Sequence, residues 1–256
     1  MKIETSHGEI YCAVHGPKNG VPVVFTHGMG LNHRSFDAQV KRLKPSYRVV
    51  VWDLPGHGLS KETGPFTFKK AADAFEAMLD ELALDGVFHV GVSLGGFVGQ
   101  YIAMHRPGRI HGLIDIGSMP LYGSMSPFKA KMGSFFMHFI KVLTNKRMAK
   151  MFAKKNSVKA PVREYLYKQA FKSGKQRFIE TSKEIFRELP KPIERSIDVP
   201  WFMIHGERER KMLIEATDKN APEARRLTVV NAAHLPNQDA PKAVNEAILD
   251  FLGKNT

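Results

Sequence analysis

One serine stands between a predicted strand and a predicted helix, in the run Gly91-Val92-Ser93-Leu94-Gly95-Gly96. A serine at such a sharp turn is held with strained backbone angles, so its hydroxyl projects clear of the sheet, and the flanking glycines let strand and helix pass close together. The backbone N–H of Leu94 begins the helix and is suited to stabilise a developing oxyanion. The pattern therefore predicts a nucleophile at Ser93.

A serine hydroxyl is a weak nucleophile at neutral pH and needs a base to take its proton. Among the 11 histidines we choose His234, because it follows the last predicted strand and precedes the last predicted helix. A hydroxyl and an imidazole paired in this way perform acyl transfer.

The elements that must position these residues alternate along most of the chain. Segments 3–5 and 10–14 are typical of an opening hairpin. Further strand patterns fall at 21–26, 48–52, 87–92, 112–116, 199–204 and 227–230, and helical periodicity falls at 35–43, 68–84, 94–105 and 240–252. Alternation of this kind predicts a mostly parallel sheet with helices on both faces. Between 127 and 189 the pattern is helical, with no convincing strand. Because sheet elements lie on both sides of it, we expect an inserted unit at 119–195 and one core domain formed by 1–118 and 196–256.

Four segments occur in an order that resembles the α/β-hydrolase superfamily, and the resemblance covers nearly the full length of the chain. The resemblance rests on the Ser93 elbow and on three further segments: His27-Gly28-Met29-Gly30, Asp53-Leu54-Pro55-Gly56-His57-Gly58-Leu59-Ser60 and Asn231-Ala232-Ala233-His234-Leu235-Pro236. It implies an eight-stranded α/β fold in which the insertion after strand six forms a helical cap over the active site.

The resemblance also implies roles for single residues. The backbone N–H of Met29 would join that of Leu94 in an oxyanion hole. His27 is expected to brace the Met29 loop, and His57 to hydrogen-bond within its own turn.

The third member of the implied triad departs from the family's usual pattern. Where relatives commonly carry Asp, the run Ile204-His205-Gly206-Glu207-Arg208-Glu209 carries Glu209. Glutamate can orient an imidazolium as aspartate does, and Glu209 is our choice. Glu207 lies two residues too early, and Asp115, at the end of the preceding strand, is a relocated alternative. A solvated cluster with Arg208, Arg210 and Lys211 is the non-catalytic alternative.

The implied activity is that of a serine carboxylesterase, cleaving an ester or lactone with an apolar portion through an acyl-enzyme. Enol-lactones, acyl-homoserine lactones and thioesters are alternative substrates, and a receptor with slow turnover is the alternative from another class. We expect no cofactor and no metal, because neither a P-loop nor H-E-x-x-H spacing is present. A single Cys12, strand-sized apolar runs and no apolar leader at the first residues favour a cytoplasmic protein.

The inserted segment is apolar as well as basic. Phe135, Phe136, Phe139, Ile140 and Leu143 fall at helical spacing and are expected to pack on the sheet domain, with Met132, Phe136 and Phe139 as candidates to contact an apolar acyl or aryl group.

The charge of the chain is concentrated in the same segment. The sequence has 38 Lys and Arg against 25 Asp and Glu, and 119–191 alone has 17 against four. A solvated face, attraction of an anionic substrate and weak association with an anionic membrane are the alternatives for this charge. Nucleic acid is not expected as a partner, since no nucleic-acid motif is present.

Overall fold

The computed structural model describes residues 1–61, 64–209 and 211–256. Its strands are Lys2–Thr5 (β1), Gly8–His15 (β2), Pro22–Thr26 (β3), Arg48–Trp52 (β4), Val87–Val92 (β5), Ile110–Ile116 (β6), Trp201–Gly206 (β7) and Arg225–Val229 (β8). Its α-helices are Asp37–Leu43 (α1), Phe68–Glu81 (α2), Leu94–His105 (α3), Pro127–Val142 (α4), Asn145–Asn156 (α5), Ala160–Glu188 (α6), Lys211–Asn220 (α7), Pro236–Asp239 (α8) and Pro241–Asn255 (α9), and a 3₁₀ turn, His33–Phe36, precedes α1.

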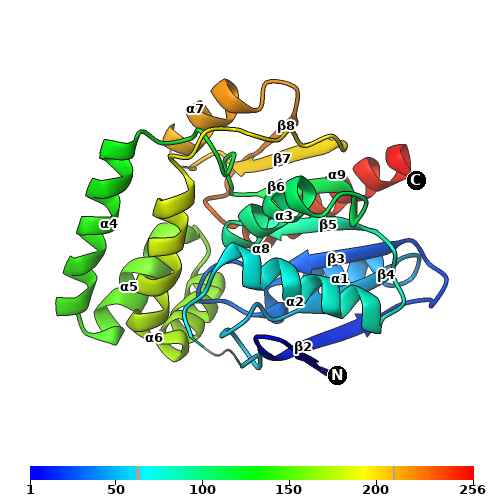
Figure 1. Cartoon of the computed structure of the whole chain (residues 1–256), viewed down its shortest axis with the longest axis horizontal. Helices are drawn as coiled ribbons and strands as arrows, with labels where there is room; N and C mark the ends of the chain where they lie inside the picture. Colours follow the sequence, from blue (N-terminus) through cyan, green and yellow to red (C-terminus); the bar gives the residue numbers. More distant parts are fainter. Residues whose placement is uncertain (62–63, 210) are drawn as a thin grey trace.

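The eight strands form one sheet in the order β1-β2-β4-β3-β5-β6-β7-β8 (Figure 1). β1 pairs with β2, and β2 with β4, in antiparallel fashion, while the other neighbours are parallel. The parallel strands read as continuous apolar runs because both faces of the sheet are covered. The predicted mostly parallel, eight-stranded α/β sheet is confirmed.

Helices cover the two faces of the sheet, and alternate residues of the strands belong to two separate apolar cores. Val24 and Val50 pack in the core that includes residues of α2 and α3, while their neighbours Val23 and Val49 pack in the core that includes residues of α9. Side chains of successive strand residues point to opposite faces, which explains the division.

The long helical segment between β6 and β7 consists of α4, α5 and α6. Helix α6 packs on both α4 and α5. It also meets loops that follow strands of the sheet: Gly30, after β3, lies against the ring of Phe178, and Gly56, after β4, lies against Arg177. Helix α6 therefore sits beside the carboxyl ends of these strands, and α4 lies on its outer side (Figure 1).

The aromatic face of α4 does not pack on the sheet domain, contrary to our expectation. The side chains of Phe135, Phe136 and Phe139 are all more than half exposed. Helix α4 instead contacts α6 through its opposite side, where Gly133 lies against the ring of Phe186 and Ala130 is buried. Small residues allow the close approach of two helices, so the large side chains are left outside.

No helix in the described ranges combines the length and the apolar character that crossing a lipid bilayer would require.

Candidate active site

Ser93 occupies a strained turn between β5 and α3. Its φ of 52° and ψ of −110° lie in a region that residues other than glycine rarely adopt. A Cβ at Gly91 would overlap the backbone of Gly95, and a Cβ at Gly95 would overlap the carbonyl oxygen of Thr26. The amide of Ser93 donates to the carbonyl of Ile116 at 2.8 Å, which fixes the turn to β6.

The structure brings Ser93, His234 and Glu209 into one hydrogen-bonded chain. Nε2 of His234 lies 2.9 Å from Oγ of Ser93, and Nδ1 of His234 lies 2.8 Å from Oε2 of Glu209. Because a carboxylate only accepts, Nδ1 carries the proton, and Nε2 is left to accept from the serine hydroxyl. The Glu209 side chain is 1% exposed and that of His234 is 11% exposed, so water screens the pair weakly.

Two backbone segments position the imidazole and the carboxylate. In the turn after β7, the amide of Glu209 donates to the carbonyl of Gly206, and the amide of Arg208 donates to the carbonyl of Ala232, both at 2.9 Å. His234 follows β8, and the amide of the preceding Ala233 donates to Oδ2 of buried Asp239 at 3.0 Å. The carboxylate turn is thus bonded to the segment that carries the histidine.

Within the described residues, neither alternative acid makes a hydrogen bond or an ion pair with His234, whose Nδ1 is paired with Glu209. Asp115 accepts hydrogen bonds from Nε2 of Gln100 at 2.7 Å and Nε1 of Trp201 at 2.8 Å. Its complete burial raises the pKa of this carboxyl to about 8. Glu207 accepts from the amide of Asn231 at 3.0 Å.

The predicted charge cluster beside Glu209 is described in part. Arg210 lies outside the described residues, whereas Arg208 and Lys211 are exposed. Lys211 pairs with Glu215, one turn along α7, at 3.4 Å.

The loop that carries Met29 lies against the serine turn. A Cβ at Gly28 would lie 3.4 Å from the carbonyl oxygen of Val92 and 3.6 Å from Cβ of Ser93. The amide of Leu94 belongs to the first residue of α3 and so has no partner within that helix. Among the described residues, neither the Leu94 nor the Met29 amide donates to another backbone group.

His27 joins the Met29 loop to the loop after β4. Its Nδ1 donates to the carbonyl of Gly28 at 2.8 Å, and its Nε2 accepts from the amide of Leu54 at 3.0 Å. Burial lowers the pKa of His27, which favours the neutral ring that both hydrogen bonds require. His57 makes the expected contact within its own turn, between Nδ1 and the carbonyl of Pro55 at 3.1 Å.

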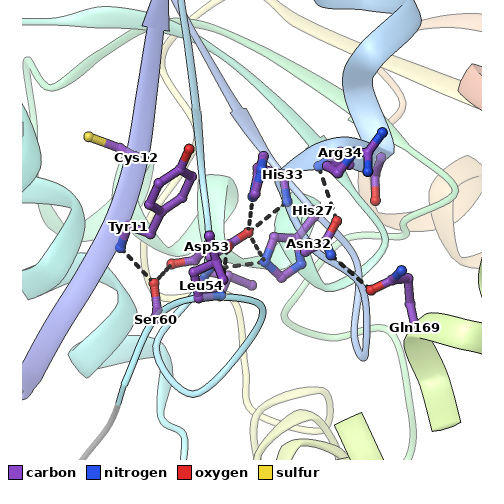
Figure 2. Close-up of polar contacts among 12 residues, drawn as sticks. Tyr11, Cys12, His27, Asn32, His33, Arg34, Asp53, Leu54, Ser60 and Gln169 are labelled. Atoms are coloured by element: carbon purple, nitrogen blue, oxygen red, sulfur yellow. Dashed lines mark hydrogen bonds and ion pairs between the residues drawn. The ribbon is translucent and has the colours of Figure 1, made fainter. Parts of the chain in front are cut away.

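Asp53 is a buried carboxylate at the centre of this region, and the sequence did not indicate its contacts (Figure 2). Oδ1 accepts from the amide of His33 at 2.7 Å and lies 2.9 Å from its Nδ1, while Oδ2 accepts from the amide of Leu59 at 2.8 Å. Burial acts to raise the pKa of Asp53, but the hydrogen bonds from His33 and from the backbone N–H of Leu59 outweigh it and lower the pKa. Asp53 therefore holds two loops together as an anion.

The three residues proposed to contact substrate are not brought to the serine. Met132, Phe136 and Phe139 lie exposed on α4, and no described contact joins them to Ser93. Met29 instead packs on a small cluster in which Met148 of α5 and Phe178 of α6 are buried, and from α4 it is Ile140 that packs on this cluster. Periodicity marks both sets as apolar and does not tell which one faces the Met29 loop.

Within the described residues, no three His, Cys, Asp or Glu side chains are grouped so that they could hold a metal ion.

Comparison with protein families gives one match that covers most of the chain. Residues 23–247 match the model of the alpha/beta hydrolase family. The enol-lactonase of Burkholderia xenovorans LB400 superposes with a TM-score of 0.83 at 18% identity, covering 99% of this chain and 100% of that one. At this identity the likeness shows the fold.

Two curated relatives match over a shorter region at higher identity. The pimeloyl-[acyl-carrier protein] methyl ester esterase of Vibrio campbellii is 36% identical over 110 residues, which are 43% of this chain and 42% of that protein. The non-heme chloroperoxidase of Streptomyces lividans is 37% identical over 123 residues, which are 46% of this chain and 44% of that protein. The chain thus spans less than half the length of each of these two relatives.

Proposed function

The chain belongs to the alpha/beta hydrolase family, and from this premise we propose that it hydrolyses carboxylic esters with Ser93 as nucleophile, His234 as base and Glu209 as the acid of the triad. The observation that carries the proposal is the chain of hydrogen bonds of 2.9 and 2.8 Å through the two nitrogens of His234. The name of the Vibrio relative supports an ester substrate.

The proposed reaction begins when Oγ of Ser93 attacks the carbonyl carbon of the ester and its proton passes to Nε2 of His234. The Met29 and Leu94 amides hold the oxygen that becomes negative. The carbon–oxygen bond to the alcohol then breaks, and the alcohol leaves with the proton from His234. Glu209 stabilises the imidazolium that exists between these transfers.

Water completes the cycle. His234 takes a proton from the water molecule, which attacks the acyl-enzyme, and then returns that proton to Oγ of Ser93 as the carboxylic acid leaves. These steps draw only on side chains and backbone of the chain and require no cofactor. A lactone opens by the same steps, except that its alcohol and acid stay in one molecule.

We further propose that residues 119–195 act as a cap over a core formed by 1–118 and 196–256. The contacts of α6 with the loops after β3 and β4 support this division. Met29, Met148 and Phe178 form an apolar cluster beside the Met29 loop, and this favours an ester with an apolar acyl group.

Turnover of p-nitrophenyl acetate and butyrate by wild type and Ser93→Ala tests the proposal. We expect the variant to lose activity by at least about a thousandfold and to lose labelling by a fluorophosphonate. Ser46→Ala, at an exposed serine after α1, is the matched control and should behave as wild type. Equal turnover by wild type and Ser93→Ala would refute the nucleophile.

The name of the Streptomyces relative makes halide oxidation the competing activity. Bromination of monochlorodimedone with hydrogen peroxide and bromide measures it beside the ester assay. We expect ester turnover to be the faster by at least about tenfold, which would exclude a principal haloperoxidase role. A panel of esters, enol-lactones, acyl-homoserine lactones and thioesters then ranks the substrates. No turnover across this panel, with retained ligand binding, would indicate a receptor.

A further inference from the structure

Helix α4 turns a row of large apolar side chains toward solvent. The apolar face of α4 consists of Phe128, Met132, Phe135, Phe136, Phe139 and Val142, whose exposed fractions are 72, 56, 66, 65, 55 and 80%. Spacings of three and four residues place all six on one side of the helix. An exposed apolar surface of this kind on a folded chain marks a binding surface.

Positive charge surrounds the apolar face. Between residues 127 and 163 the sequence contains ten Lys and Arg and no Asp or Glu. At helical spacing Lys129 and Lys131 fall on opposite borders of the face, and both are exposed. Helix α5 adds a largely basic outer surface whose exposed residues are Asn145, Lys146, Arg147, Lys150, Met151, Lys154 and Lys155.

The position of α4 leaves this face accessible. α4 is the outermost of the three inserted helices and lies far from the sheet (Figure 1). Its carboxyl end is held on α6, because Nζ of Lys175 donates to the carbonyls of Lys141 and Leu143 at 2.6 and 3.1 Å. A partner can therefore cover the apolar face without displacing the helix from α6.

The positive charge and the exposed apolar side chains of α4 together indicate which kind of partner covers this face. A second copy would bring two surfaces of the same positive sign together, which opposes pairing through this face. An anionic bilayer accepts both features, since apolar side chains of an interfacial helix enter the boundary between headgroups and acyl chains while lysine stems extend to the headgroups.

We propose that α4 lies in the surface of an anionic lipid bilayer, with its apolar face inserted and the basic residues of α4 and α5 against the headgroups. This proposal goes beyond ester hydrolysis and does not depend on it.

Sedimentation of the whole protein with vesicles tests the proposal. Vesicles of phosphatidylcholine alone are compared with vesicles that also contain phosphatidylglycerol, at low and high salt. We expect the wild type to bind the anionic vesicles at least about tenfold more tightly at low salt, and to lose this preference at high salt.

Two double variants separate the contributions of the apolar face and of the positive charge to vesicle binding. Phe135→Ser with Phe139→Ser, and Lys129→Glu with Lys131→Glu, should each weaken binding to anionic vesicles by at least about tenfold. The matched controls are Met212→Ser with Val230→Ser, at exposed apolar residues of the sheet domain, and Lys41→Glu with Arg42→Glu, on α1. Both controls should bind as wild type.

Three results would overturn the proposal. The first is failure of the wild type to sediment with anionic vesicles at low salt, and the second is undiminished binding by the Phe135 and Phe139 double variant. The third is that the wild type forms a saturable complex with a purified acidic protein, or a dimer in sedimentation velocity, and that the Phe135 and Phe139 double variant loses this complex or dimer but still binds vesicles. Turnover of p-nitrophenyl butyrate is measured for every variant, so that a failure of the membrane proposal is distinguished from a failure of the proposed ester hydrolysis.

Discussion

Oε2 of Glu209 lies 2.8 Å from Nδ1 of His234, although a glutamate side chain is one methylene longer than the aspartate that commonly holds this place in the family. The turn after β7 accommodates the extra length. Its amides donate back to the carbonyls of Gly206 and Ala232, so the backbone at Glu209 stays close to the end of the strand. The longer side chain then spans the distance to the imidazole.

Glu209→Gln and Glu209→Asp test the role of this carboxylate. Glutamine removes the charge that stabilises the imidazolium, so we expect kcat/KM for p-nitrophenyl butyrate to fall by about 10²- to 10⁴-fold. Aspartate keeps the charge but falls short by a methylene, so we expect a loss of about tenfold to a hundredfold. Thermal midpoints near that of the wild type would show that folding is intact.

Glu207→Gln is the matched control, because Glu207 is an exposed carboxylate in the same turn that contacts Asn231 rather than the imidazole. Its kcat/KM should stay within about twofold of wild type. Wild-type turnover by Glu209→Gln would show that the acid lies elsewhere.

Gly95→Ala tests the packing that exposes Ser93. The added Cβ would overlap the carbonyl oxygen of Thr26, which belongs to β3 and cannot move without disturbing the sheet. We expect the free energy of unfolding in urea to fall by about 3 kcal/mol or more, with loss of activity. Gly253→Ala, in α9 with no atom near the new Cβ, should instead raise it by about 0.5 to 1 kcal/mol. Equal effects of the two substitutions would contradict the close approach at Gly95.

Asp53→Asn tests the junction between the loops after β3 and β4. The asparagine side chain offers one accepting oxygen where the carboxylate uses two, so the backbone N–H of either His33 or Leu59 would face the NH₂ group, which is another donor. We expect a loss of about 1 to 3 kcal/mol in unfolding free energy. We also expect a fall of about tenfold in kcat, because the loop that carries Met29 is less firmly held.

The control for Asp53 is Asp37→Asn. Asp37 is an exposed carboxylate that pairs with Arg34 at 3.4 Å, and its loss should cost less than about 1 kcal/mol. If Asp53→Asn and Asp37→Asn have the same unfolding free energy and the same kcat, the contacts of Asp53 do not hold the loop that carries Met29.

The strands of the sheet were largely predictable from the sequence, since a strand buried on both faces must be apolar throughout. The run 48–52 coincides with β4, and 87–92 with β5. Helix α8 was not predicted, because four residues are too few to display periodicity. The orientation of α4 was predicted wrongly. Periodicity identifies an apolar side of a helix, while the neighbour it packs on is decided by where small residues such as Gly133 permit contact.

The sequence could predict those residues of the candidate site that directly follow strands. Ser93, His234 and Glu209 each follow a strand, and the carboxyl ends of neighbouring parallel strands meet at one edge of a sheet. The contact of Asp53 with His33 could not be anticipated in this way. It joins loops that are brought together only because β3 pairs with β4.

Asp115 predicts how stability depends on pH. Its pKa is raised to about 8 by burial, whereas in an unfolded chain an aspartate titrates near about 3.9. Between these values the folded protein holds a proton that the unfolded chain releases. The contribution of this group to the unfolding free energy therefore falls by about 1.4 kcal/mol for each unit of rising pH, and it becomes constant above about pH 8.

Asp115→Asn removes this dependence, because its amide oxygen still accepts from Gln100 and Trp201 but the side chain has no acidic proton. In urea unfolding, the variant should therefore gain stability relative to wild type from about pH 5 to about pH 8 and gain no more at higher pH. Asp250→Asn is the control, since the pKa of exposed Asp250 is lowered by hydrogen bonds from Lys254 and Arg225, so this carboxylate is charged in both states over the whole range. A constant difference between Asp115→Asn and wild type would mean that Asp115 is already ionised in the folded protein over this range and would contradict the raised pKa.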